Sequence, residues 1–262
     1  MASDRIHIVS VLRHETGVTE RLTDAVAAED PLEIRLGNTS LAVTMRTPGD
    51  DSDLVLGFLL SEGILLSPHE VRSIDRVADS VVSVQLIEDV AVDPARFQRN
   101  TFISSSCGVC SKTSLETVKL LAPPVPNFAV PRSVLGHLTD ELRGHQPTFD
   151  TTGGLHAAGV FDLAGNLVAA REDVGRHNAV DKVIGATAAQ NWPLPQSLLV
   201  VSGRQSFEIV QKAAVVGIGG VVGVSAPSSL AVDLAGTVGL LLVGFARGDT
   251  FNVYAGEHHI RE

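Results

Sequence analysis

Short segments of alternating apolar and polar residues dominate the first hundred positions. Residues 32–36 alternate strictly, with their apolar side chains on one face, and residues 41–45 alternate next. Gly37-Asn38 separates them, and a two-residue connection of this composition favours a hairpin. Aspartates at positions 50–53 are typical of a helix start, with Gly63 suited to its end. Further strands are predicted over residues 5–12, 71–77 and 81–87. The pattern therefore predicts a small α+β unit.

The pattern changes near residue 150, where apolar strands begin to alternate with amphipathic helices. Continuous apolar runs over residues 197–201, 221–224 and 239–245 are typical of strands buried on both faces. Buried strands covered by helices make a layered α/β sandwich. The other elements predicted here are helices over residues 178–189, 207–214 and 228–235, a hairpin over residues 159–171, and a last strand over residues 251–254.

Residues 100–112 break both patterns. They read NTFISSSCGVCSK, and their serines and glycine disfavour regular structure, so a loop is predicted. A helix should follow, because Thr113 and Glu116 have the spacing of a capping box. Four prolines between positions 123 and 131 then predict a stiff connector. We therefore expect an N-terminal domain (1–99), a connecting segment with the loop and a short helix (100–149), and a C-terminal domain (150–262).

The composition narrows the possible partners. The 262 residues include 20 Lys and Arg against 30 Asp and Glu, a net charge of −10. Binding to duplex DNA needs clustered Lys and Arg, and only 4% of the residues are aromatic, too few for base-stacking platforms. We therefore expect no nucleic-acid partner, although one small anion can still bind in a local arginine pocket.

No segment predicts export or membrane insertion. Charged residues interrupt the first fifteen positions, which lack the apolar run of a secretory signal. The most apolar stretch, residues 213–245, contains serines, a proline and an aspartate, and its many glycines and β-branched residues favour buried strands over a membrane span. Two cysteines cannot staple a chain of this length. The sequence thus predicts a soluble cytoplasmic protein that makes no membrane contact.

Cys107 and Cys110 are the only cysteines, and they lie three positions apart in the serine-rich loop. Lys112 and the start of the predicted helix should lower a thiol pKa there, because both favour the thiolate. A tetrahedral zinc site needs two more ligands unless two chains share it, a thioredoxin-like pair belongs beside a βαβ unit, and the zinc-deaminase signature lacks its His-x-Glu and proline. What remains is a reactive thiol, acting as nucleophile or group carrier, or else two incidental small residues.

Small polar residues follow each of the three buried strands. The segments are Ser202–Ser206, Ser225–Ser229 and Phe245–Thr250, and the first and third carry Arg204 and Arg247. Ligands bind where parallel strands end, and arginine pairs with phosphate. Three such segments on one edge of a sheet predict a site for a bulky ligand with phosphates.

A charged cluster between Arg171 and Lys182 has two interpretations. It lies where a strand ends and a helix begins, so it can bind an anion at the helix N-terminus, or it can be a solvated helix start with surface ion pairs. In a generic protein the second arrangement is the commoner one. Gly153, Gly154 and His156 lie just upstream, and the sequence does not show whether they share this edge.

Eight blocks of the sequence are distinctive and are, in chain order, AEDPLEIRL, TPGD, GFLLSEGI, SSSCGVC, EDVGRHNAVDKVIG, SGRQSFEIVQKA, GVSAPSSLAVDLA and GFARGDTFNVY. Together they resemble the FdhD/NarQ family of formate dehydrogenase accessory sulfurtransferases, and the similarity spans nearly the whole chain. The resemblance implies an α+β protein overall, in which a small N-terminal α+β roll precedes a cytidine-deaminase-like α/β/α sandwich, and it implies a homodimer.

The resemblance also implies a function. Members carry sulfur from a cysteine desulfurase to the Mo-bis(molybdopterin guanine dinucleotide) cofactor, or its tungsten counterpart, before that cofactor enters formate dehydrogenase. Cys107 matches the persulfide carrier, whereas Cys110 can resolve a disulfide, share the sulfur or be dispensable. Arg204 is a further candidate for the phosphates, and GDP is the natural analogue. The guanine dinucleotide contact matches Phe245, Ala246, Arg247, Gly248, Asp249 and Thr250.

Two other functions stay open at this point. The first is a chaperone that binds, protects and delivers the molybdenum cofactor without acting on it, with the cysteine loop as a docking or redox element. The second is a plain thiol–disulfide oxidoreductase, which requires a reversible disulfide between Cys107 and Cys110. Loss of sulfur transfer with retained nucleotide binding in a double cysteine variant distinguishes the sulfur carrier from the chaperone.

Overall fold

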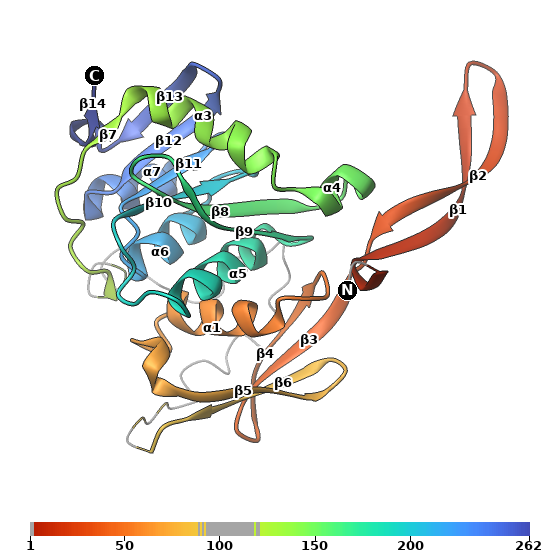
Figure 1. The fold of residues 1–262 in the computed structure, drawn as a ribbon, viewed down its shortest axis with the longest axis horizontal. Helices are drawn as coiled ribbons and strands as arrows, with labels where there is room; N and C mark the ends of the chain where they lie inside the picture. The colour runs from red at the N-terminus through yellow and green to blue at the C-terminus, as the bar shows by residue number, and fades with distance from the viewer. Residues whose placement is uncertain (1–2, 89, 91, 93–117, 119–120) are drawn as a thin grey trace.

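The computed structural model describes residues 3–88, 90, 92, 118 and 121–262. The chain forms a small N-terminal sheet and a larger C-terminal sheet, with helix α1 (Asp51–Ser61) between the first sheet and the helices of the second (Figure 1). A long two-stranded arm projects away from both.

The N-terminal sheet has the strand order β4-β3-β6-β5. The predicted hairpin over residues 32–45 is confirmed, and Gly37 takes a positive φ of 57° at its turn. The parallel pairing of β3 with β6 brings the β3–β4 hairpin beside the β5–β6 hairpin. The bounds are β3 (Asp30–Leu36), β4 (Thr39–Arg46), β5 (Val71–Ala78) and β6 (Val81–Leu86), with a short 3-10 turn at Pro68–Glu70.

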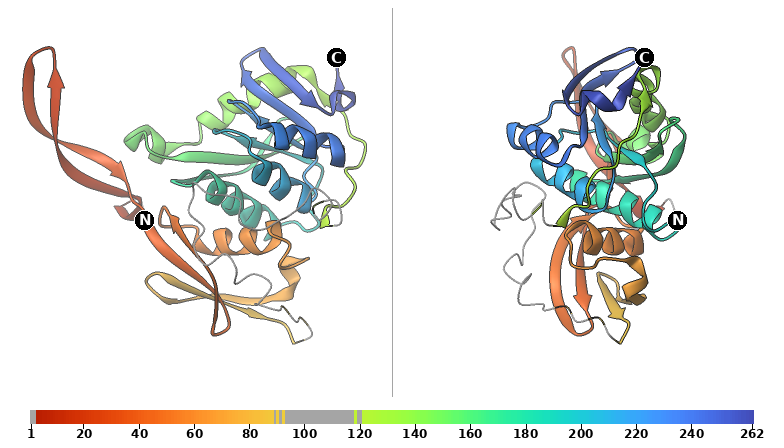
Figure 2. Two further views of the ribbon diagram at one scale, coloured as in Figure 1. Left: turned by 180° about the vertical axis from the view of Figure 1, so that it is seen from behind. Right: turned by 90° about the vertical axis from the view of Figure 1, so that its left-hand side faces the viewer.

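The arm consists of β1 (Ile6–Glu15) and β2 (Val18–Ala27), paired in regular antiparallel register after a 3-10 turn at Ser3–Arg5. The left view in Figure 2 shows it extending from the body of the molecule. The first strand was predicted, but the second was not. Most side chains of β2 are exposed on both faces, so its sequence lacks the alternation that a half-buried strand shows.

The C-terminal sheet has six strands in the order β13-β12-β11-β10-β8-β9. Neighbours β10, β11 and β12 are parallel, and β8 is antiparallel to both β10 and β9, so β9 runs in the direction of β10. The bounds are β8 (His156–Asp162), β9 (Leu167–Asp173), β10 (Ser197–Val201), β11 (Gly220–Gly223), β12 (Leu241–Arg247) and β13 (Thr250–Ala255). These strands confirm the predicted hairpin and the three predicted buried strands.

Side chains of β10 alternate between two hydrophobic clusters. Leu199 packs with the helices that follow the strands, whereas Leu198 and Val200 pack with a helix on the other face. This division confirms an α/β/α sandwich. One layer contains α5 (Arg176–Ala188), α6 (Phe207–Val215) and α7 (Ser229–Val238), and the other contains α3 (Arg132–Arg143).

Helix α3 was not predicted, because prolines dominate the segment before it. Its Leu135, Leu138 and Leu142 recur at helical spacing and are fully buried against the sheet. A short helix, α4 (Pro147–Thr152), follows it and was also missed. The pairing of β7 (Val130–Pro131) with β14 (Ile260–Arg261), just after the 3-10 turn Glu257–His259, ties the start of this segment to the C-terminus.

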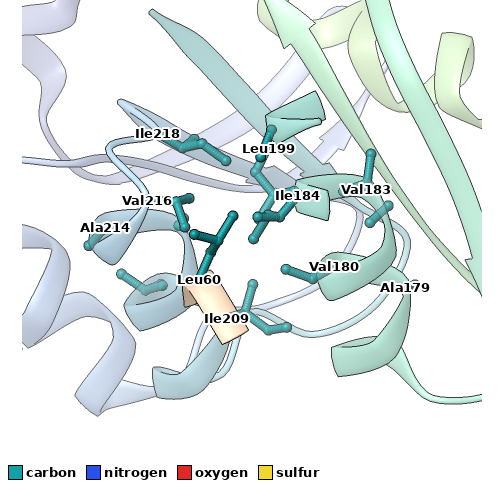
Figure 3. Packing of buried hydrophobic residues seen from close by; sticks show 14 of the residues in the cluster. Leu60, Ala179, Val180, Val183, Ile184, Leu199, Ile209, Ala214, Val216 and Ile218 are labelled. Carbon is teal, nitrogen blue, oxygen red and sulfur yellow. The ribbon is translucent and has the colours of Figure 1, made fainter. Parts of the chain in front are cut away.

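Helix α1 joins the two sheets into one core. Its Leu60 lies among residues of α5, α6 and the following loop, including Val180, Ile184, Ile209 and Val216 (Figure 3). The same cluster continues to apolar residues of the N-terminal sheet. The N-terminal sheet is therefore held against the C-terminal layers by a shared core.

Candidate functional site

The ends of the parallel strands meet at one edge of the C-terminal sheet, as predicted. Gln205 connects them: its backbone N–H donates to Ala226 O (3.2 Å), and its carbonyl accepts from Ser228 N (2.9 Å). Its buried side chain donates from Nε2 to Val243 O (3.0 Å). Residues 202–206, 225–228 and 245–250 are called the carboxyl edge below.

Two further elements reach the same edge. The first strand of the hairpin starts there, since Ala157 N donates to Ser202 Oγ (2.9 Å) and His156 pairs with Asp173 at the end of β9. Helix α5 follows β9 directly, so Arg176 lies at the edge as well. His156 and the start of α5, which the sequence left unplaced, therefore join the carboxyl edge.

Phe245 is the most unusual residue of the edge. Its φ is +54°, a left-handed conformation that costs an aromatic residue energy, and its side chain is 45% exposed. A register shift between Gly244 and Arg247 marks the irregularity in β12, and the Phe245 N–H donates to Ser225 O (3.2 Å). Backbone strain and an exposed ring at a strand end are typical of a binding site.

The rest of the predicted contact segment forms the turn between β12 and β13. Gly248 has a φ of +51°, which confirms the predicted sharp turn. Asp249 is 95% exposed, with its carboxylate 3.5 Å from Nε2 of His137 on α3. Ala246 is buried, and its carbonyl accepts from Thr139 Oγ1 (2.9 Å), so it anchors the turn to α3.

Two arginine side chains and one threonine side chain complete this part of the edge. Arg204, Arg247 and Thr250 are exposed. Thr250 donates to Arg247 O (3.0 Å), whereas neither arginine head group has a partner among the residues that the structure describes. Two guanidinium groups are thus available to an anionic ligand.

Two histidines beside Arg176 are held neutral. Burial, together with Lys212, Arg176 and His156, lowers the pKa of His177 to about 3. Burial and then Arg176 also lower the pKa of His156, although Asp173 acts in the opposite direction. His177 Nε2 lies 3.4 Å from Ser206 Oγ, which links α5 to the start of α6. Arg176 therefore carries the only full positive charge of this group at neutral pH.

The inner part of the cluster between Arg171 and Lys182 is structural. Lys182 Nζ lies 2.8 Å from Asp173 and donates to Thr47 O (2.8 Å), with both charged side chains fully buried. The expectation of surface ion pairs is wrong for these residues, because they close the contact between the two sheets. Glu172 is buried too, and accepts from the N–H groups of Thr148 and Phe149 at the start of α4.

The predicted cysteine loop is not part of the carboxyl edge segments. Cys107, Cys110, Lys112 and the predicted helix start at Thr113 fall outside the described residues. Within the ranges that the structure describes, no group of three or more His, Cys, Asp or Glu side chains is arranged to hold a metal ion. None of the described helices combines the length and the apolarity needed to cross a membrane.

Sequence reasoning missed three features of the edge. It did not foresee the strain at Phe245, the neutral pair His156 and His177, or the approach of α3 to the turn at Gly248. The one available signal was the Arg176-His177 pair directly after a predicted strand. The others depend on which segments pack together.

The fold and the edge define a two-sheet α/β protein whose parallel strands end beside the exposed side chains of Arg204, Phe245 and Arg247. The model of the FdhD/NarQ family matches residues 27–261, and the chain belongs to this family. The match begins where the arm ends, so it covers both sheets and the whole carboxyl edge.

Known proteins resemble the chain over most of its length. A sulfur carrier protein FdhD of Streptomyces avermitilis is 48% identical over 95% of this chain and 94% of the relative, and one of Sulfolobus acidocaldarius is 40% identical over 98% and 99%. The crystal structure of a putative formate dehydrogenase accessory protein from Desulfotalea psychrophila superposes with a TM-score of 0.80 at 25% identity. That superposition covers 98% of this chain and 99% of the other.

Proposed function

We propose that the protein is a sulfur carrier that passes persulfide sulfur to the Mo-bis(molybdopterin guanine dinucleotide) cofactor before that cofactor enters formate dehydrogenase. The observation that carries the proposal is the exposed, strained Phe245 beside Arg247 and Asp249 at the carboxyl edge. The names of the relatives, sulfur carrier and formate dehydrogenase accessory protein, support the same direction.

The carrier in this proposal is Cys107. Its thiolate attacks the terminal sulfur of a desulfurase persulfide, a new S–S bond forms on Cys107, and the desulfurase thiolate leaves with the electrons of the bond that breaks. On delivery the S–S bond of the persulfide breaks, and Cys107 returns to its thiolate form. Two electrons from the metal centre or a thiol reductant convert the released terminal sulfur to sulfide. The partners are a cysteine desulfurase, formate dehydrogenase and a second copy of the chain.

The cofactor is the substrate in this scheme, and the turn after β12 binds its guanine end. Asp249 is almost fully exposed, so its two oxygens can accept from the N1–H and the exocyclic amino group of guanine. Adenine lacks this pair of donors. The ring of Phe245 offers an apolar face beside it, and Arg247 or Arg204 meets phosphate oxygens, where a charge-assisted bond contributes roughly 1.5–3 kcal/mol.

Mass spectrometry tests the sulfur step. After incubation with desulfurase and cysteine, the peptide containing Cys107 should gain the mass of one sulfur atom, and Cys107→Ser should abolish formate dehydrogenase maturation. Cys110→Ser is the matched control, because it removes a thiol from the same loop. Full maturation by the Cys107→Ser variant together with retained GDP binding rejects the carrier and leaves the chaperone function.

Calorimetry of GDP against ADP tests the nucleotide site. Wild type should prefer GDP, and Asp249→Ala should remove the preference. Selectivity that survives the substitution removes Asp249 from this role, and a wild type that binds no GDP removes the segment 245–250 altogether.

A further inference from the structure

Arg176 is a permanent charge without a counter-charge. Its Nε atom is shut off from solvent and has no hydrogen-bond partner, and the guanidinium forms no ion pair with the residues that the structure describes. The neighbouring carboxylate of Asp173 is already occupied, because its two oxygens accept from Gly175 N (2.9 Å), Asn178 Nδ2 (3.0 Å) and Thr47 N (3.1 Å) and pair with Lys182. A partly buried guanidinium in this state can accept an anion from outside the chain as its counter-charge.

Gly203, His156 and His177 lie near Arg176, and Ser206 contacts His177. A Cβ atom built on Gly203 would lie 3.3 Å from His156 Nδ1 and 3.8 Å from Arg176 Cδ, so this backbone approaches both side chains. His177 and Ser206 follow, joined by their 3.4 Å contact. Arg176, His156, His177, Gly203 and Ser206 are called the Arg176 cluster below.

Two helices begin at this cluster without a side-chain cap. Gly175 caps α5 and has no side chain, and the hydroxyl of Ser206 before α6 makes no capping bond and lies instead near His177. In contrast, Ser228 before α7 accepts from Ala231 N (3.3 Å). The free N–H groups of α5 and α6 therefore add hydrogen-bond donors and partial positive charge beside Arg176.

The neutral state of His156 and His177 suits the binding of a phosphate group. Both imidazoles are neutral at pH 7, so each can donate one N–H without repelling Arg176. A bidentate guanidinium, imidazole N–H groups, a hydroxyl and backbone N–H groups match the many acceptor oxygens of a phosphate. Carboxylates have too few oxygens to use this number of donors.

The distance between the Arg176 cluster and the turn after β12 indicates which phosphate ligand fits. Strands of a sheet lie about 4.8 Å apart, so the end of β10 beside the cluster is about 10 Å from the end of β12. An extended nucleotide can span this distance. We propose that the Arg176 cluster binds the diphosphate of the guanine nucleotide whose base contacts residues 245–250, an inference that rests on the proposed function.

Calorimetry with Arg176→Gln tests the assignment. The variant should lose at least about tenfold in affinity for GDP and for ADP alike, since the diphosphate is common to both. Asp249→Ala should instead affect GDP selectively. Arg176→Lys should keep part of the affinity, and Arg72→Gln, a change at an exposed ion pair in the N-terminal sheet, should keep all of it. GDP affinity that is equal in wild type and Arg176→Gln overturns the assignment.

A measurement on wild type guards against a variant that folds poorly. Addition of inorganic pyrophosphate should shift the NMR signals of the His156 and His177 rings in a saturable way, while those of His7 and His14 on the arm stay in place. Ring signals of His156 and His177 that stay unchanged at saturating pyrophosphate and, in a second titration, at saturating GDP overturn the diphosphate site. Persulfide formation on Cys107 should persist in Arg176→Gln, because this variant changes only the diphosphate site. If wild type itself forms no persulfide, the proposed function fails, whereas the test of this site is unaffected.

Discussion

Gly57 of α1 and Gly185 of α5 face each other where the two helices cross. A Cβ atom on Gly57 would lie 1.8 Å from Asp181 O, and one on Gly185 would lie 1.9 Å from Asp53 O. No side chain fits between these backbones, so the pair sets how closely the N-terminal sheet is held to the C-terminal layers. The carboxyl edge depends on this contact, because α5 also presents Arg176.

We predict that Gly185→Ala destabilises the protein by about 1–3 kcal/mol, because the added methyl group forces the two helices apart. Urea unfolding measures the change. Gly236→Ala in α7 is the control: nothing lies within 4 Å of its added Cβ, so the better helix former should stabilise by roughly 0.5–1 kcal/mol. Equal effects of the two substitutions contradict the crossing argument.

A second prediction concerns the buried charges of Lys212 and Asp181 near this helix crossing. Lys212 Nζ donates to both oxygens of Asp181 (2.9 and 3.0 Å), to Glu62 (2.6 Å) and to Ser61 (3.0 Å). Asp181 and Glu62 raise the pKa of Lys212 against the effect of burial. Lys212→Met leaves a buried carboxylate without its cation and should cost about 3–5 kcal/mol in urea unfolding. Adding Asp181→Leu to that variant should recover part of the loss, and no recovery disproves the charge argument.

The stability should depend on pH through His177. Its folded pKa of about 3 lies below the unfolded value near 6.5, so the unfolded chain binds a proton first as the pH falls. Its contribution is therefore complete above pH 6.5 and lost as the pH falls toward 3, by roughly 2 kcal/mol at pH 5. Asp181 acts in the opposite direction, because burial raises its pKa to about 6.

Comparing the pH profiles of wild type and His177→Gln separates the two groups. The free energy of unfolding, measured between pH 4 and pH 8, should fall less steeply on the acid side in the variant. Profiles that run parallel would show that the pKa of His177 is the same in the folded and the unfolded chain, which contradicts the prediction.

Phe245 separates stability from binding. Phe245→Gly removes the strain of a left-handed aromatic residue and should raise stability by up to about 1 kcal/mol, while GDP affinity falls because the exposed ring is lost. Thermal unfolding and calorimetry on the same sample test both parts. Phe245→Leu keeps the strain and loses the ring, so it should weaken binding without a gain in stability. Unchanged GDP affinity in both variants contradicts a role for the ring.

Much of the fold follows from local patterns in the sequence. Residues 32–45 carry both the alternation and the turn composition of a hairpin, and residues 197–201 form β10 as predicted, since a short continuous apolar run is typical of a strand buried on both faces. The shared edge of the predicted segments 202–206, 225–229 and 245–250 was also predictable, because parallel strands in one layer end on the same side. The assignment of Cys107 rests on sequence alone.

The tertiary structure decided what depends on contacts between distant segments. Helix α3 covers the second face of the sheet, a partner that the helical spacing of its leucines does not identify, and Gly185 is required only because Asp53 lies against it. Arg176 is likewise one charge among many in the sequence, and it becomes a candidate phosphate ligand because Lys182 and Thr47 occupy Asp173 and Gly203 brings the start of α6 beside it. Local periodicity records which face of an element is buried, whereas the partner of that face is chosen by the packing of the whole chain.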